Sequence, residues 1–148
     1  MKLISIAFVF FAVALSNCQD DFRTLEITKI KYGTSFGMCM GYCTQILIIE
    51  NNIASKKLVS RNESDSEKSC SRSINSSEIF SQVNRERFND LPETIGCPDC
   101  ADGGSEWIEI TTNIGSKKVI YEYGKEPNEV KGYIDDLRSL YEELGTCE

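Results

Sequence analysis

The chain has 148 residues, of which 41% are apolar and 26% charged, and it contains no histidine. This length and composition predict one globular domain, and exclude a disordered, collagenous or polytopic membrane protein. The absence of histidine excludes Ser-His-Asp and Cys-His catalytic pairs and every metal site built on imidazole.

The N-terminus begins with Met1-Lys2 and continues with an uncharged apolar run from Leu3 to Leu15. This run is too short to span a bilayer, which takes about 20 residues. One lysine, an apolar centre and small residues before Cys18 are typical of a secretory signal peptide. The sequence therefore predicts a signal peptide over residues 1–17.

The end of this segment, Leu15-Ser16-Asn17-Cys18, resembles the lipobox of bacterial lipoproteins, in which the cysteine is acylated and becomes the first residue. The acidic stretch Gln19-Asp20-Asp21-Phe22 that follows is similar to the surface-export signal of Bacteroidota lipoproteins. We expect lipidation at Cys18, a lipidated tether over residues 18–24, and attachment to the outer membrane or cell surface through the acyl chains. Cleavage after Ser16 would instead give a soluble secreted protein.

The charge of the processed chain is acidic. Without Lys2 it carries 15 basic side chains and 23 carboxylates, a net charge of −8, and it has no basic stripe. This pattern disfavours nucleic-acid partners and electrostatic docking on anionic lipid.

Six cysteines remain if Cys18 carries lipid, an even number that favours disulfides in an oxidising compartment. Six cysteines allow 15 pairings, and sequence alone does not select one. The preferred set consists of two local bridges and one that closes a long loop: Cys39 with Cys43, Cys97 with Cys100, and Cys70 with Cys147.

In the alternative to disulfides, four of these cysteines are the thiolate ligands of one structural zinc: Cys39, Cys43, Cys97 and Cys100. The export signal argues against it, because disulfide formation competes with metal binding outside the cytosol. A redox role for Cys97-Pro98-Asp99-Cys100 is less favoured still, because a turn rather than a helix follows this motif.

The first half of the domain reads as strands. Residues 25–32 and 43–50 carry strand-forming side chains on either side of a glycine-rich loop at 33–41, and residues 55–60 supply a shorter third strand. The polar, serine-rich segment 61–73 is expected to be an exposed loop.

The second half mixes helices with a hairpin. Asn75 to Glu78 resembles a capping box, and the apolar residues up to Phe88 predict one short helix before Pro92. A long loop over residues 91–104 precedes two alternating runs, 106–112 and 117–123, that indicate a hairpin.

The last predicted element is a helix that begins near Pro127. Apolar side chains recur at helical spacing from Val130 to Leu144, and Gly145 suits a left-handed C-terminal cap. The order of elements predicts one α+β domain over residues 25–148: a small antiparallel β-sheet with two helices on one face, stapled by disulfides.

This order of elements resembles a domain of unknown function common in exported bacterial proteins, including Bacteroidota-type lipoproteins, with a Cys-Phe-Gly-x-Cys-Pro-x-Tyr loop. The matching residues run from Ser35 to Cys43, with Ser35 in place of the first cysteine of the pattern and Met40 in place of its proline. Lys125-Glu126-Pro127 before the last helix also agrees. The resemblance implies a fold and export, and no activity.

No residue pattern indicates catalysis, and we expect neither a metal nor a cofactor. Asp99, Asp102 and Glu106 have the chemistry of calcium ligands but not the EF-hand spacing, and are interpreted as a solvated acidic loop. Glu106 and Glu109 are an arbitrary choice as a glycosidase pair. The expected role is a non-enzymatic accessory or binding protein, with contacts from the cysteine-bearing loops.

Two apolar features of the chain fit either binding or packing. Trp107 is expected to pack against the sheet rather than to line a sugar- or peptide-binding surface. The glycine-rich loop carries Phe36, Met38 and Met40, which suit an adaptable contact surface and a core plug equally well.

Overall fold

The computed structural model describes residues 25–62 and 64–147. The predicted signal peptide (1–17), the tether (18–24) and the lipidation site Cys18 lie outside the described residues.

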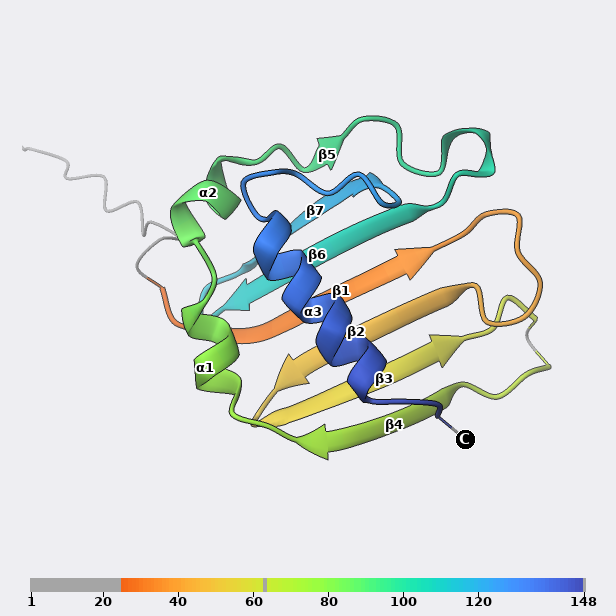
Figure 1. The fold of residues 1–148 in the computed structure, drawn as a ribbon, viewed down its shortest axis with the longest axis horizontal. Coiled ribbons are helices and arrows are strands. Elements are labelled where there is room, and N and C mark those ends of the chain that lie inside the picture. The colour runs from red at the N-terminus through yellow and green to blue at the C-terminus, as the bar shows by residue number, and fades with distance from the viewer. Residues whose placement is uncertain (1–24, 63, 148) are drawn as a thin grey trace, which may run out of the picture.

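The centre of the domain is one sheet with the strand order β4-β3-β2-β1-β6-β7-β5 (Figure 1). Neighbouring strands are antiparallel except β5 and β7, which are parallel. The first strand of the domain therefore lies inside the sheet, between β2 and β6. The strands are β1 (Ile27–Ser35), β2 (Thr44–Glu50), β3 (Ile53–Val59), β4 (Lys68–Ser73), β5 (Thr94–Ile95), β6 (Ser105–Thr112) and β7 (Ser116–Glu122).

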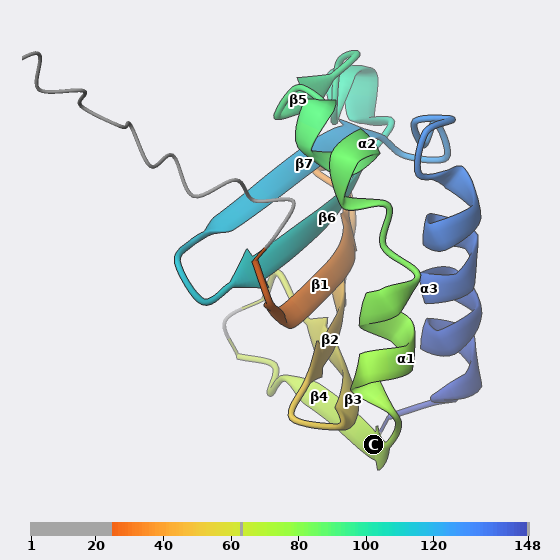
Figure 2. The same cartoon turned by 90° about the vertical axis from the view of Figure 1, so that its left-hand side faces the viewer.

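The described residues form three α-helices, which lie on the same face of this sheet (Figure 2). The short helices α1 (Ser76–Ser81) and α2 (Arg85–Asp90) lie near one end of the strands, and α3 (Lys131–Glu143) crosses the strands obliquely (Figure 1). A 3-10 turn, η1 (Cys100–Asp102), precedes β6. The prediction of two helices on one face is therefore correct about the face and wrong about the number.

The hydrophobic core fills the space between the sheet and these helices. Because side chains alternate along a strand, every second residue of the central strands faces α3. Each fully buried aliphatic or aromatic side chain contributes about 1.5–3 kcal/mol of transfer free energy. The largest fully buried apolar side chains are Tyr121, Phe88, Ile30, Leu47, Ile49, Ile108, Ile110, Ile134, Leu137 and Val119.

Two strands formed in segments that the sequence predicted to be loops. β4 lies within 61–73, and β5 lies within 91–104. β4 is an edge strand with the sequence KSCSRS, and it pairs with β3 through backbone hydrogen bonds while most of its side chains stay exposed. An edge strand of this kind carries no apolar alternation, so periodicity could not reveal it.

The helix predicted after Asn75 is two helices, α1 and α2. The Asn84 side chain interrupts the run by accepting a hydrogen bond of 3.0 Å from the Arg87 amide, which caps a new helix. The predicted capping box is also wrong, because the Asn75 side chain makes no capping bond. Asn52 takes that role: its side chain accepts from the Ser76 amide at 3.2 Å, and its amide donates to Ser76 Oγ at 3.0 Å.

The last helix begins later than predicted. The Val130 amide donates to the Pro127 carbonyl at 3.1 Å, so the proline belongs to a turn and α3 starts at Lys131. The predicted left-handed cap is confirmed, with a φ of 72° at Gly145.

Three cysteine pairs lie at disulfide distance, and they are the pairs that the sequence favoured. The Cα atoms are 5.6 Å apart in Cys39–Cys43, 5.1 Å in Cys70–Cys147 and 5.5 Å in Cys97–Cys100. The first and third are local bridges in loops. Cys70–Cys147 joins edge strand β4 to the segment after α3, so it fixes the end of the helix to the edge of the sheet.

The other face of the sheet has no helix over it in the described part of the chain (Figure 2). Trp107 lies on this face, in contact with the backbone of Gly33, where an added Cβ would come within 2.6 Å of the indole ring. The Lys118 ammonium lies 4.2 Å from the centre of the indole. The expectation that Trp107 packs against the sheet is confirmed, and Gly33 is the residue that permits it.

Candidate functional site

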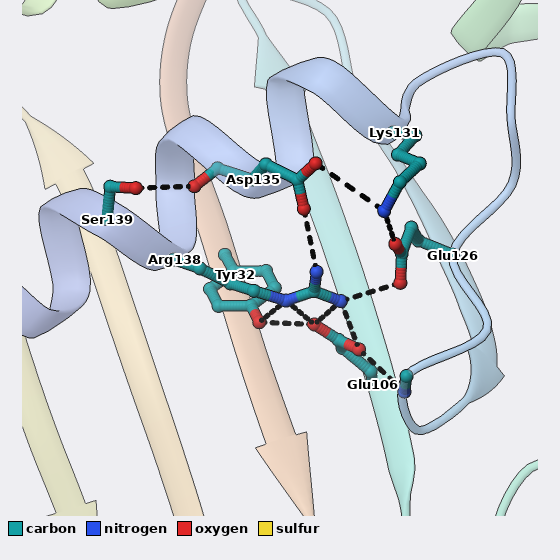
Figure 3. A network of polar contacts seen from close by, with 8 residues as sticks. Tyr32, Glu106, Glu126, Lys131, Asp135, Arg138 and Ser139 are labelled. Atoms are coloured by element: carbon teal, nitrogen blue, oxygen red, sulfur yellow. Dashed lines mark hydrogen bonds and ion pairs between the residues drawn. The ribbon is translucent and has the colours of Figure 1, made fainter.

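The candidate site begins with a buried ion pair between β6 and α3 (Figure 3). Glu106 faces the helices, and its side chain is fully buried. Arg138 on α3 donates from Nε to Glu106 Oε1 at 2.9 Å and from one terminal nitrogen to Glu106 Oε2 at 2.9 Å. Such a two-point contact fixes both the distance and the rotation of the helix over the sheet.

Two further groups complete the surroundings of the Glu106 carboxylate. The Tyr32 hydroxyl on β1 donates to Glu106 Oε1, and the Gly124 amide donates to Oε2 at 3.1 Å. Burial and the neighbouring carboxylate raise the pKa of Tyr32, so this hydroxyl keeps its proton. Every oxygen of the carboxylate therefore has donors, which is what a buried charge requires.

A second layer of charges surrounds Arg138 closer to the solvent. Its guanidinium donates to Glu126 at 2.8 Å and to Asp135 at 2.9 Å, and Lys131 forms ion pairs with both of these carboxylates. The Arg138 and Lys131 contacts lower the pKa of Glu126 from 4.5 to about 2. Glu126, in the segment before α3, is thereby bound to two residues of the helix.

The Glu126 contacts predict a specific loss of stability in acid. A carboxyl whose pKa is lower in the folded state stabilises the protein above pH 4.5, and this contribution disappears between pH 4.5 and 2. Over that interval the wild type should lose about 2 kcal/mol more than Glu126→Gln, less than the full pKa difference implies because water reaches Lys131. Urea titrations at several pH values measure this. Glu129→Gln, which removes an exposed carboxylate of the same segment, should keep the wild-type slope, and an unchanged slope in Glu126→Gln would contradict the assignment.

A cavity of about 250 Å³ opens beside this ion pair, between the sheet and α3. The ordered charges of Arg138 form part of its wall, and four aromatic residues supply most of the rest. It is lined by Tyr32, Thr34, Phe36, Gln45, Tyr123, Arg138, Tyr141 and Glu142.

Contacts with Gly104 and with the Gln45 side chain hold three of the four aromatic residues. The Phe36 ring packs on Gly104, where a Cβ would come within 2.4 Å of the ring, and it meets the Tyr123 ring edge-on at a centroid distance of 4.8 Å. The Tyr123 amide donates to the Gly104 carbonyl. At the other side, the Tyr141 hydroxyl donates to Gln45 Oε1 at 2.5 Å. Gly104 therefore positions two of the four rings.

A second cavity lies on the other side of Tyr141. This cavity of about 400 Å³ shares Gln45, Tyr141 and Glu142 with the first. It contains Lys56, whose ammonium lies 3.8 Å from the Tyr141 ring centre and donates to the Gly145 carbonyl at 2.8 Å. The Lys56 ammonium is therefore bound to the Gly145 carbonyl and the Tyr141 ring, on the side of Tyr141 that faces away from the first cavity.

The structure separates the acidic residues that the sequence grouped. Glu106 is buried against Arg138, whereas Glu109, three residues along the same strand, lies on the opposite face and pairs with Lys31 at 3.5 Å. They cannot act across one cleft. Asp99 accepts a hydrogen bond from the Gly37 amide at 3.1 Å. The interpretation of Glu106 as part of a solvated acidic loop is wrong.

Among residues 25–62 and 64–147, no group of three or more Cys, Asp or Glu side chains is arranged to hold a metal ion. The four cysteines of the zinc alternative lie within these ranges and form two separate pairs. The geometry gives that alternative no support.

Sequence reasoning missed Arg138. The sequence does contain a pattern that could have identified it. Residue 138 lies four positions after Ile134 and three before Tyr141, within the apolar stripe of α3. A charged residue in that stripe indicates a buried partner. Nothing in the local sequence, however, identified Glu106 as that partner.

No helix in the described part of the chain is long and apolar enough to cross a membrane. No family model matches the chain, and a search of curated proteins found no match either.

Proposed function

We propose that this protein is an exported, lipid-anchored binding domain without catalytic activity, and that its ligand site is the cavity between α3 and the sheet. The signal peptide, the lipobox-like Cys18 and the acidic residues after it support export and anchoring. The cavity supports the binding role: it is concave, half of its lining residues are aromatic, and a few polar groups are fixed in place.

Most polar side chains of the cavity wall are committed to contacts within the protein, and on this ground we propose that it has no catalytic activity. A general acid or base needs a free side chain within reach of a substrate. Among the described residues, Glu142 is the one free carboxylate of the lining and is exposed to solvent, whereas Glu106 and Arg138 are saturated by each other and by neighbours, and the Tyr32 hydroxyl is committed to Glu106. These groups hold the walls of the cavity, and their charges are already balanced by the protein.

Binding is tested by NMR on the processed chain carrying Cys18→Ser, with phenol, indole and methyl glucoside as neutral probes. We expect saturable amide shifts around Phe36 and Tyr123, and their loss in Thr34→Trp, which fills the cavity. The melting curve of Thr34→Trp controls for its folding. Shifts elsewhere only, or none, would overturn the proposed ligand site.

Anchoring is tested separately in a bacterial host by fractionation. The wild type should sediment with membranes, and Cys18→Ser should move to the soluble fraction because the acyl chains supply the attachment. Cys39→Ser/Cys43→Ser, which removes two thiols but leaves the lipobox, is the matched control and should stay with membranes. Sedimentation of Cys18→Ser with membranes would contradict lipidation, and a soluble wild type would favour the secreted alternative.

A further inference from the structure

We infer that the cavity beside Arg138 recognises a methylated ammonium group, as in choline-type ligands. This inference rests on the proposed binding function and specifies the ligand. Two properties of the cavity fit such a group: four aromatic residues line it, and the carboxylates in and behind its wall outnumber the cations there.

The walls provide the surface on which such a cation binds. Tyr32, Phe36, Tyr123 and Tyr141 line one small cavity, and the negative faces of aromatic rings attract ammonium groups within about 6 Å. Tyr123 is 51% exposed, so its ring is accessible at the entrance. A volume of about 250 Å³ suits a headgroup rather than a larger molecule.

The charges favour a cation over an anion. Arg138 and Lys131 are the two cations beside the cavity, and their charges are offset by four carboxylates. Three of these form ion pairs with them, and the fourth, Glu142, lines the cavity: Glu106, Glu126, Asp135 and Glu142. Glu142 is exposed and makes no ion pair among the described residues. Arg138 is surrounded by three carboxylates, so it cannot serve as a free anion receptor. Lys56, in the neighbouring cavity, is bonded on the far side of Tyr141.

The aromatic share of the lining favours a methylated ammonium over a primary one. A primary ammonium has three N–H donors and loses stability if they are buried without acceptors. The Tyr32 hydroxyl is bonded to Glu106, and Gln45 Oε1 accepts from Tyr141. Glu142 is then the one free carboxylate of the lining, and the hydroxyls of Thr34 and Tyr123 are the other side-chain oxygens of the lining without a bond among the described residues. A methylated ammonium needs aromatic contact and charge, but no acceptors.

The test uses NMR titrations of the processed chain with Cys18→Ser and three probes, of which the first two are matched in size. The probes are choline, its tert-butyl analogue in which carbon replaces the charged nitrogen, and ethanolamine. We expect choline to bind at least about fivefold tighter than either of the others. Tyr123→Leu should weaken choline binding about fivefold, and Glu142→Gln about threefold.

The matched control for Glu142→Gln is Glu143→Gln, the next residue of α3, whose carboxylate pairs with Arg72 instead. It should leave choline binding unchanged. Equal binding of choline and the tert-butyl analogue would overturn the inference and leave the proposed function intact, since the cavity would still bind a ligand. Binding of the neutral probes without choline would do the same. Failure of every probe at the cavity would overturn both.

Discussion

Replacing Arg138 with methionine is expected to lower the free energy of unfolding by about 3 kcal/mol at neutral pH. The variant leaves the Glu106 carboxylate fully buried without its cation, and breaking a buried ion pair costs about 3–5 kcal/mol. The lower end of this range applies because the Arg138 side chain is 32% exposed. Urea denaturation followed by tryptophan fluorescence measures the loss.

Arg72→Met is the matched control for this variant. Arg72 also pairs with a glutamate of α3, Glu143, but both side chains are largely exposed, so the loss should be below about 1 kcal/mol. A second variant, Glu106→Met/Arg138→Met, removes both charges and should recover part of the stability lost in Arg138→Met. Equal losses in Arg72→Met and Arg138→Met would contradict the importance assigned to the buried pair.

Removal of the Cys70–Cys147 bridge, by the double variant Cys70→Ala/Cys147→Ala, should cost about 4 kcal/mol. The bridge joins residues 77 positions apart, and the entropy that a cross-link removes from the unfolded chain grows with loop length. The variant should also release the end of α3 from β4. Urea denaturation under non-reducing conditions measures the difference.

The two short bridges are internal controls for this prediction. Their partners are four and three positions apart, so the Cys→Ala pair at either site should cost only about 2 kcal/mol. Equal losses at all three sites would contradict the loop-length account. An unchanged melting temperature of the wild type in strong reductant would show that the bridges are not formed.

The parts of the fold that periodicity predicts are those with an apolar face to bury. β2 contains Leu47 and Ile49 within an apolar run, and α3 repeats apolar residues every three or four positions, so both were found. β4 has no such face, because at the sheet edge its pairing depends on the backbone. The break between α1 and α2 depends on one side-chain hydrogen bond at Asn84, which competes with continuation of the helix.

The candidate site was less predictable than the fold. Its walls come from β1, the loop after it, β2, the turn after β7, and α3, which are brought together only by the strand order. The sequence indicates Phe36 as a candidate contact residue. It does not indicate the neighbour of Phe36 in the cavity, Tyr123, which lies 87 positions further along the chain. Glu106 was predicted to lie with Asp99 and Asp102 in a solvated acidic loop. It is buried instead, because neighbouring residues of a strand face opposite sides of the sheet, and Glu106 faces the helices while Trp107 faces away from them.

The central position of β1 also decides the order in which the domain can assemble. β1 to β4 form a meander of short-range pairings, whereas the other edge of β1 must wait for β6, whose paired residues follow it by 70 positions or more. Closing so long a loop slows folding, and a chain that emerges from its N-terminus first keeps this edge open until β6 is available. An open edge is a template for strand addition by other chains. Lys29 and Lys31, which lie on that strand and pair with Glu50 and Glu109 in the finished domain, place charge on it during the interval.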